Sequence, residues 1–213
     1  MNAPGSAAVN EWEGKLSKWV REACIAEVSF QKPGNVTLSH GFDDADAADF
    51  IKSAEIIAPM ISAANADNIG ETILSAVGAT KTAVGHNTNL GIVLLLAPLA
   101  AVPRGISVSD GIEAVLSALT VDDAVLVYRA IAAAAPGGLG EAESQDITDT
   151  PSQNLRVCMA LAADRDLIAA QYVNGFRDVL EFGLIQLIST RDWSGEMSRW
   201  RIGWLAVELM ARR

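Results

Sequence analysis

The feature that most constrains the fold is a long uncharged stretch in the middle of the chain. No charged residue stands between Lys81 and Arg104, and residues 90–102 are almost entirely apolar. A membrane-spanning helix takes about 20 apolar residues, so this run is too short to cross a bilayer. It also contains Pro98. An apolar helix that does not cross a membrane has to be enclosed by protein on all sides. Residues 90–102 therefore predict a central core helix.

The segments on either side of this run carry apolar side chains at helical spacing. Half of the 213 residues are hydrophobic, and Ala and Leu are abundant. No run shows a sustained alternation of apolar and polar residues, which favours helix over strand. A chain of this length can form one substantial core. We therefore predict an all-α, single-domain multi-helix bundle of about eight helices in residues 10–213, after a flexible N-terminus at residues 1–9.

Capping signals and helix breakers set the expected helix ends. Asp44 or Asp46 can cap the second helix, and residues 120–123 resemble a capping box. Pro59 lies inside the second helix and is expected to kink or split it. The expected helices cover residues 10–29, 46–64, 68–84, 90–102, 109–119, 120–135, 151–166 with a bent continuation, and 193–213.

The charge and the cysteine content exclude several classes of protein. A formal net charge of −10 argues against a broad surface for nucleic acid or anionic lipid, although a local cation can still bind an anionic small molecule. Cys24 and Cys158 are too few for a disulfide framework, and we interpret both as buried thiols. The N-terminus lacks the basic and apolar regions of a secretory signal, which predicts a cytoplasmic protein.

A polar segment, residues 32–46, separates the first two helices and carries most of the groups suited to chemistry. Lys32 supplies a cation, Gly34 allows close approach of the backbone to a ligand, and His40 can exchange protons near neutral pH. Three carboxylates offer hard oxygen ligands to a divalent cation: Asp43, Asp44 and Asp46. The alternative is a polar turn in which an aspartate caps the second helix.

A second polar loop precedes the central helix, where four backbone amides lack internal partners. Thr88 or Asn89 as an N-cap would explain one of its residues but not the adjacent Asn87. We expect the three side chains to line a ligand site, with capping alone as the alternative. Further along, Asp166 is flanked by two apolar residues that can draw it toward the core, where it would need a cation or a donor. A surface salt bridge with Arg165 or Arg177 is the other interpretation.

Common catalytic signatures are absent from the sequence. It contains no phosphate-binding G-x-x-x-x-G-K-[ST], no G-x-G-x-x-G after a strand, no H-E-x-x-H and no G-x-S-x-G. Two histidines in the whole chain exclude a His-rich metal centre. The two polar loops therefore carry the functional prediction.

These loops, in their order and spacing, resemble the triphosphoribosyl-dephospho-CoA synthase family, and the form of the second loop is similar to a shorter subgroup known from archaea and methylotrophic bacteria. The matching segments are E-V-S-F-Q-K-P-G-N-V (residues 27–36), His40 with D-D-A-D (residues 43–46), F-I-K-S-A (residues 50–54) and N-T-N-L-G (residues 87–91), with a weaker match to about Tyr172. Other members carry His and Lys where this chain has Asn89 and Leu90. Against the family pattern a C-terminal segment is expected to be missing, which leaves altered activity, lost activity or completion by a second subunit as alternatives.

The resemblance implies transfer of a triphosphoribosyl group from ATP to 3′-dephospho-CoA with release of adenine. This makes the precursor of the prosthetic group of citrate lyase and malonate decarboxylase acyl carrier proteins. It implies Mg²⁺ held by Asp43, Asp44 or Asp46, with Asp44 and His40 as catalytic groups. The substrate-binding residues that it suggests are Lys32, Gly34, Asn35, Ser53, Asn87, Thr88, Asn89 and Asp166.

Two other functions stay open on the sequence alone. One is a related glycosyl or phosphoribosyl transfer in one-carbon cofactor biosynthesis of the methanopterin or methanofuran type. The other is a non-catalytic helical protein that binds nucleotides. In each case the expected partners are small-molecule nucleotides, with no nucleic acid and no membrane. The apolar last helix is compatible with a homodimer.

Overall fold

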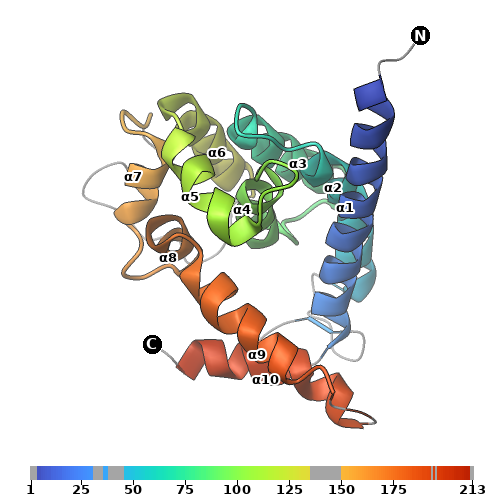
Figure 1. Cartoon of the computed structure of the whole chain (residues 1–213). Helices are drawn as coiled ribbons and strands as arrows, with labels where there is room; N and C mark the ends of the chain where they lie inside the picture. The colour runs from blue at the N-terminus through green and yellow to red at the C-terminus, as the bar shows by residue number, and fades with distance from the viewer. Residues whose placement is uncertain are drawn as a thin grey trace.

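The computed structural model describes residues 4–30, 36–37, 46–134, 150–192, 194 and 196–211. Within them the chain is all-α, as predicted, and its ten α-helices are close to the expected number (Figure 1). The elements are α1 (Pro4–Ser29), α2 (Ala47–Ser62), α3 (Ile69–Val84), α4 (Leu90–Ala100), α5 (Val108–Ala118), α6 (Val121–Ala134), α7 (Leu155–Ala160), α8 (Leu167–Asn174), the π-helical segment η1 (Asp178–Gly183), α9 (Leu184–Ser189) and α10 (Glu196–Ala211).

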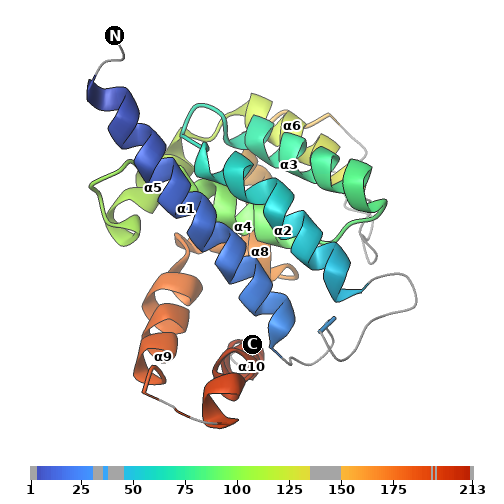
Figure 2. The same cartoon turned by 90° about the vertical axis from the view of Figure 1, so that its right-hand side faces the viewer.

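The central apolar helix is confirmed. α4 packs against α1, α2, α3, α5, α6 and α8, and it lies behind α1 and α2 in Figure 2. Val93 and Ala97 are fully buried on it. Pro98 has no N–H to donate to the Leu94 carbonyl one turn earlier, and the Tyr172 hydroxyl donates to that oxygen instead, at 2.7 Å. The proline therefore leaves no buried carbonyl without a donor at this point.

The first helix is longer than the sequence suggests. α1 begins at Pro4 rather than near residue 10. Proline suits the first position of a helix, because the N–H that it lacks would have no partner there. α1 and α2 lie side by side along much of their length (Figure 2). α2 starts after Asp46, which was one of the two predicted caps. It remains a single helix through Pro59, so the proline does not split it.

α3 and α6 cross closely because one position on α3 has no side chain. A Cβ on Gly70 would lie 2.7 Å from the Cα of Asp123 on α6, a separation that real atoms do not tolerate. The Gly70 amide instead donates to Asp123 Oδ1 at 2.8 Å. Asp123 Oδ2 accepts from the backbone and hydroxyl of Thr120, at 2.8 and 2.7 Å, so the predicted capping box is present. The same buried carboxylate caps α6 and fixes the crossing.

The long helix expected from residue 151 is broken into short pieces. Residues 161–165 form turns, and Asp166 then caps α8, which ends at Gly175 in the left-handed conformation (φ 71°). Phe176 follows with φ 60° and is fully buried, with its ring centroid 5.8 Å from that of Tyr172. The tertiary contact of Phe176 holds a backbone conformation that the sequence pattern does not predict.

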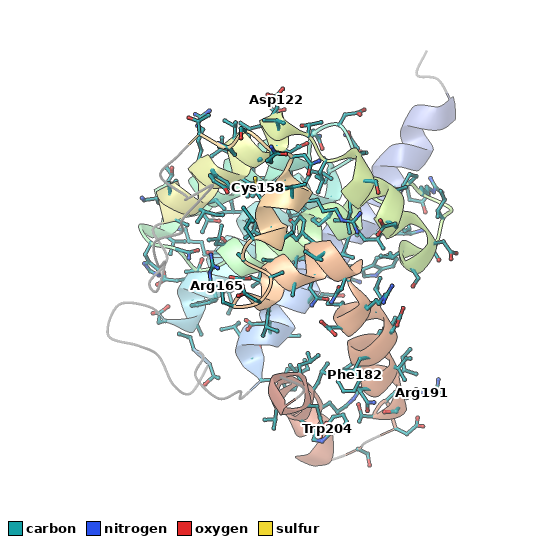
Figure 3. All side chains as sticks on the ribbon, turned by 90° about the vertical axis from the view of Figure 1, so that its left-hand side faces the viewer. Asp122, Cys158, Arg165, Phe182, Arg191 and Trp204 are labelled. Atoms are coloured by element: carbon teal, nitrogen blue, oxygen red, sulfur yellow. The ribbon has the colours of Figure 1, made fainter. Side chains whose placement is uncertain are left out.

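The C-terminal elements form a separate corner of the molecule. Figures 1 and 2 show α9 and α10 below the remaining helices, and Figure 3 shows Phe182 and Trp204 in this corner. Cys158 lies on α7 and is buried, as is Cys24 on α1, so both thiols are placed as predicted. Among the described residues, no helix has the length and apolar character needed to cross a membrane.

Candidate functional site

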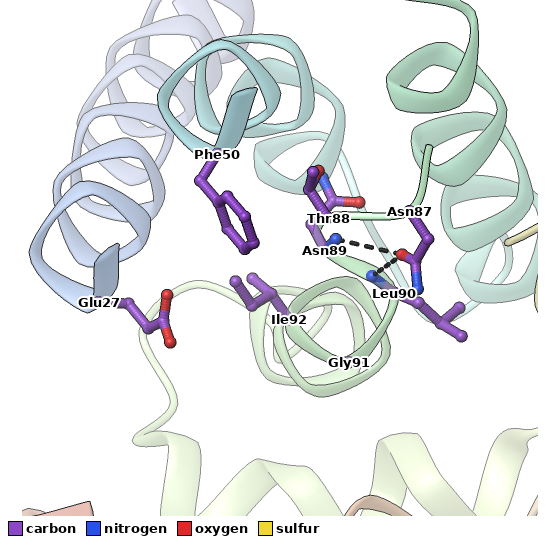
Figure 4. Close-up of a pocket in the computed structure, with 8 residues that line it drawn as sticks. All are labelled: Glu27, Phe50, Asn87, Thr88, Asn89, Leu90, Gly91 and Ile92. Atoms are coloured by element: carbon purple, nitrogen blue, oxygen red, sulfur yellow. Dashed lines mark hydrogen bonds between the residues drawn. The ribbon is translucent and has the colours of Figure 1, made fainter. Parts of the chain in front are cut away.

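Three segments that are distant in the sequence surround one cleft. These are the last turns of α1, the first turn of α2, and the loop before α4 together with the first turn of α4 (Figure 4). The cleft has a volume of about 240 Å³ and is lined by Glu27, Phe50 and residues 87–92. The polar segment at residues 32–46 is joined at one end to α1 and at the other to α2. Only its last residue, Asp46 at the start of α2, is among the described residues at either end.

Asn89 occupies the N-cap position of α4, as one of the two predicted caps, but the side chain that bonds the backbone here belongs to Asn87. Asn87 Oδ1 accepts the amides of Asn89 and Leu90, at 3.2 and 3.0 Å, whereas the predicted caps Thr88 and Asn89 make no such bond (Figure 4). A side chain that bonds the backbone two residues ahead is a common turn for Asn. With its oxygen engaged, the Asn87 side chain still has an amide Nδ2 that donates to no other described residue.

Thr88 and Asn89 line the cleft but are also anchored to neighbouring helices. Thr88 Oγ1 lies 2.6 Å from Ser53 Oγ, and Ser53 Oγ donates to the Asp49 carbonyl at 2.7 Å. A hydroxyl carries one proton, so Thr88 is the donor in this pair and keeps acceptor capacity for a ligand. Asn89 Nδ2 donates to Thr80 Oγ1 on α3 at 3.0 Å. All four side chains in these bonds are buried.

The first turn of α2 is fastened to the α3–α4 connection. Asp46 Oδ1 accepts the amides of Ala48 and Asp49, at 2.8 and 3.1 Å, which completes a capping box with Asp49. Lys52 Nζ donates to the Ala83 carbonyl at 2.6 Å. His86 Nε2 lies 3.4 Å from Asp49 Oδ2, and this contact becomes an ion pair when the imidazole is protonated. The N-termini of α2 and α4 are thus held next to one another.

The electrostatics of the cleft differ between its two ends. The amides of Gly91 and Ile92, in the first turn of α4, have no acceptor within the described residues. Open amides at a helix N-terminus favour an anionic group. On the opposite side, Glu27 is the one acidic side chain in the described lining. Burial, followed by the charge of Glu27, raises the pKa of the nearby Cys24 thiol to about 11, so this thiol is not a ready nucleophile.

The predicted site residues fall into two groups. Those in the first group lie outside the described residues, and these are Lys32, Gly34, Asn35, His40, Asp43 and Asp44. In the second group, Asn87, Thr88 and Asn89 line the cleft, while Ser53 lies behind it and bonds to Thr88. Asp46 is at the start of α2, next to this region of the chain.

Asp166 is exposed and acts as a helix cap. Its Oδ1 accepts the amides of Ile168 and Ala169, both at 2.8 Å. It follows a surface turn that carries Arg165 (Figure 3). Its side chain is therefore not drawn into the core, and it does not belong to the cleft lining. Asp166 is connected to the cleft only indirectly. The helix that it caps, α8, carries Ile168, and this side chain lies so close to Gly91 that a Cβ on the glycine would be 2.9 Å away from it.

Several lining residues were not singled out from the sequence. Phe50 and Ile92 fit apolar helical stripes, which predicted only core packing. Glu27 lies in the last turns of α1, where its direction depends on how α1 crosses α2 and α4. Their place in the sequence could have indicated Glu27 and Phe50, because each of them begins a segment that resembles the family. Within the described residues, no group of three or more His, Cys, Asp or Glu side chains could hold a metal ion.

The fold and the cleft define an all-α protein with a small cleft beside two helix N-termini. The family model CitG, described as ATP:dephospho-CoA triphosphoribosyl transferase, matches residues 13–213. Since the match covers nearly the whole chain, the protein belongs to this family, and the predicted resemblance is confirmed. The protein is accordingly a transferase of a family whose substrates are ATP and dephospho-CoA. No match was found among curated proteins or among solved structures.

Proposed function

We propose that this protein transfers the triphosphoribosyl group of ATP to a ribose hydroxyl of 3′-dephospho-CoA and releases adenine. The acceptor oxygen forms a bond to C1′ of the ATP ribose, and the bond from C1′ to the adenine nitrogen breaks. The acceptor hydroxyl loses a proton, and the departing adenine gains one. The family match supports the reaction class, and the cleft supplies a location for it.

One observation carries this proposal. The segments that resemble the family, residues 27–36, 50–54 and 87–91, come from three places in the chain and contribute Glu27, Phe50 and residues 87–91 to a single cleft. Packing alone does not require Glu27 and the polar residues 87–89 to lie around the same space. A shared ligand gives them a common purpose.

The groups around the cleft suit the parts of a nucleoside triphosphate. We assign the open amides of Gly91 and Ile92, with Asn87 Nδ2, to phosphate or ribose oxygens, because each is a donor without an acceptor in the described residues. A carboxylate near C1′ stabilises the positive charge that develops there as adenine leaves. We assign that role to Asp44, and proton transfer to His40.

A magnesium ion fits the acidic segment before α2. Mg²⁺ is commonly held by one or two carboxylates together with substrate phosphates. Asp46 commits Oδ1 to the α2 cap, which leaves Oδ2 for such an ion. We propose that Asp46, with Asp43 or Asp44, holds Mg²⁺ against the triphosphate. When bound, the ion offsets the negative charge of the phosphates, which the net charge of −10 would otherwise oppose.

The test is adenine release measured by chromatography, with ATP, Mg²⁺ and dephospho-CoA present. We expect Asp44→Asn to lose at least about a hundredfold in rate, as is typical when a group that stabilises the transition state is removed. Asp122→Asn, on the exposed first turn of α6, is the matched control and keeps the wild-type rate. If the two variants release adenine equally fast, the assignment of Asp44 is wrong. If the wild type leaves ATP intact, the proposed reaction is wrong.

A further inference from the structure

The C-terminal corner of the molecule exposes an apolar stripe on α9. None of the residues of this helix is buried. Leu184, Ile185 and Ile188 are 45, 56 and 52% exposed. Ile188 follows the other two by four and three positions, so the three side chains lie on one side of the helix. Single exposed apolar residues are ordinary, whereas a group of large ones marks a surface that contacts something.

Another side of α9 is covered by α10. Arg201 Nη2 donates to the Leu187 carbonyl at 2.6 Å, and its Nε donates to the hydroxyl of the buried Thr190 at 3.3 Å. Figures 1 and 2 show this corner below the other helices, and in Figure 3 Arg191 lies at its outer edge. The helix is therefore fixed by α10 on one side and leaves the apolar stripe open to solvent.

The distribution of charge along the chain favours this corner for contact between two copies. Residues 177–213 carry six basic and five acidic side chains, a net charge of +1. Residues 1–176 carry ten basic and twenty-one acidic side chains, a net charge of −11. Two copies repel each other through these acidic parts. The repulsion is smallest when the two C-terminal corners face each other.

The residues of the stripe and its ends are placed symmetrically about Gln186. Leu184 and Ile188 are each two positions from it, and Glu181 and Arg191 are each five positions from it. In a two-fold interface every contact occurs twice, with the two residues exchanged between the copies. A two-fold axis beside Gln186 makes the two helices antiparallel. Leu184 of one copy then meets Ile188 of the other, and Glu181 meets Arg191.

The charges at the two ends of the stripe can form contacts between copies. Glu181 lies 4.0 Å from Arg177, and Arg191 lies 3.5 Å from Asp192. These four side chains are between 72 and 88% exposed. Exposed pairs of this kind contribute little, so they do not prevent a new contact. A parallel arrangement would bring like charges together at both ends, and for this reason the antiparallel one is favoured.

We propose that the protein forms a two-fold symmetric homodimer through α9. The apolar stripe lies at the centre of the contact, and the two pairs of Glu181 with Arg191 lie at its rim, as in interfaces generally. One helix face is smaller than a standard interface of about 800 Å² per partner, so the dissociation constant is expected to be micromolar. This dimer does not depend on the proposed reaction.

Sedimentation equilibrium from about 1 to 500 µM tests the dimer, because this range spans a micromolar dissociation constant. The wild type should reach twice the 22.4 kDa of one chain. Ile188→Lys should raise the dissociation constant at least about tenfold, because it brings a charge into the apolar centre. Ile106→Lys is the matched control, since Ile106 is 50% exposed between α4 and α5, and it should keep the wild-type value. Circular dichroism checks that both variants are folded.

A wild type that stays at the mass of one chain would overturn the proposal. So would a dimer that Ile188→Lys leaves unchanged, or one that both variants weaken equally.

Charge reversal tests the antiparallel arrangement at low ionic strength, where exposed charges are least screened. Glu181→Arg and Arg191→Glu each place like charges opposite one another, and each should raise the dissociation constant by about fivefold. The double variant restores opposite charges and should return to within about twofold of the wild type. If the double variant is as weak as the single ones, or if the single ones dimerise like the wild type, the proposed pairing of Glu181 with Arg191 is wrong.

Discussion

Tyr172 should stabilise the central helix only because Pro98 interrupts the hydrogen bonding of that helix. Tyr172 is fully buried, and its hydroxyl donates to the Leu94 carbonyl at 2.7 Å. In an unbroken helix the amide of residue 98 would occupy that carbonyl. In Tyr172→Phe the carbonyl becomes a buried acceptor without a donor, which costs about 1–3 kcal/mol. In Pro98→Ala the missing amide is restored, so the same substitution should then cost less than about 0.5 kcal/mol.

A double-mutant cycle measures this coupling directly. The free energy of unfolding is determined by urea denaturation for the wild type, both single variants and the double variant. Any loss of packing at residue 98 is common to two corners of the cycle and cancels. The expected coupling is about 1–2 kcal/mol. If Tyr172→Phe costs the same in both backgrounds, the hydroxyl does not substitute for the amide that proline removes, and the reasoning is refuted.

Three further predictions concern other buried positions. Gly70→Ala should destabilise the protein by about 1–3 kcal/mol, because its Cβ would overlap the α6 backbone. Gly78→Ala, in the same helix and with open space, should stabilise it by up to about 1 kcal/mol, and equal effects in urea denaturation would contradict the close crossing. Thr88→Val should cost about 1 kcal/mol through the lost bond to Ser53, and an unchanged urea midpoint would argue against that bond. Cys24 has a pKa raised from 9.0 to about 11 by burial, so its stabilising contribution is complete below pH 9 and is lost as the pH rises toward 11. The urea midpoint should therefore fall more steeply over this range in the wild type than in Cys24→Ala, and parallel curves would contradict the burial of the thiol.

The sequence was most informative where burial repeats along one helix face. The apolar run in the middle of the chain predicted α4, and apolar side chains at helical spacing predicted a helix at residues 68–84, where α3 lies. Asp46 and the capping box at residues 120–123 were also found, because a cap depends on residues close together in the sequence.

The features that were missed depend on contacts between distant segments. Asn89 is at the N-cap position of α4 as predicted, but Asn87 supplies the side-chain acceptor, since the choice among adjacent polar residues depends on the path of the loop. The break after α8 includes Phe176, which is buried in the core with φ 60° and packs beside Tyr172. Glu27 lines the cleft because of the crossing of α1 with other helices. Sequence periodicity contains none of this information.

The proposed reaction moves a triphosphoribosyl group from ATP to dephospho-CoA. Mass spectrometry of the complete reaction, with Mg²⁺ present, tests it most directly. We predict free adenine and a product equal in mass to dephospho-CoA plus the triphosphoribosyl group, formed in equal amounts. Adenine without that product would indicate hydrolysis of ATP at the glycosidic bond, and ADP or AMP would indicate phosphoryl transfer. Either result, or unchanged ATP, would contradict the proposed function.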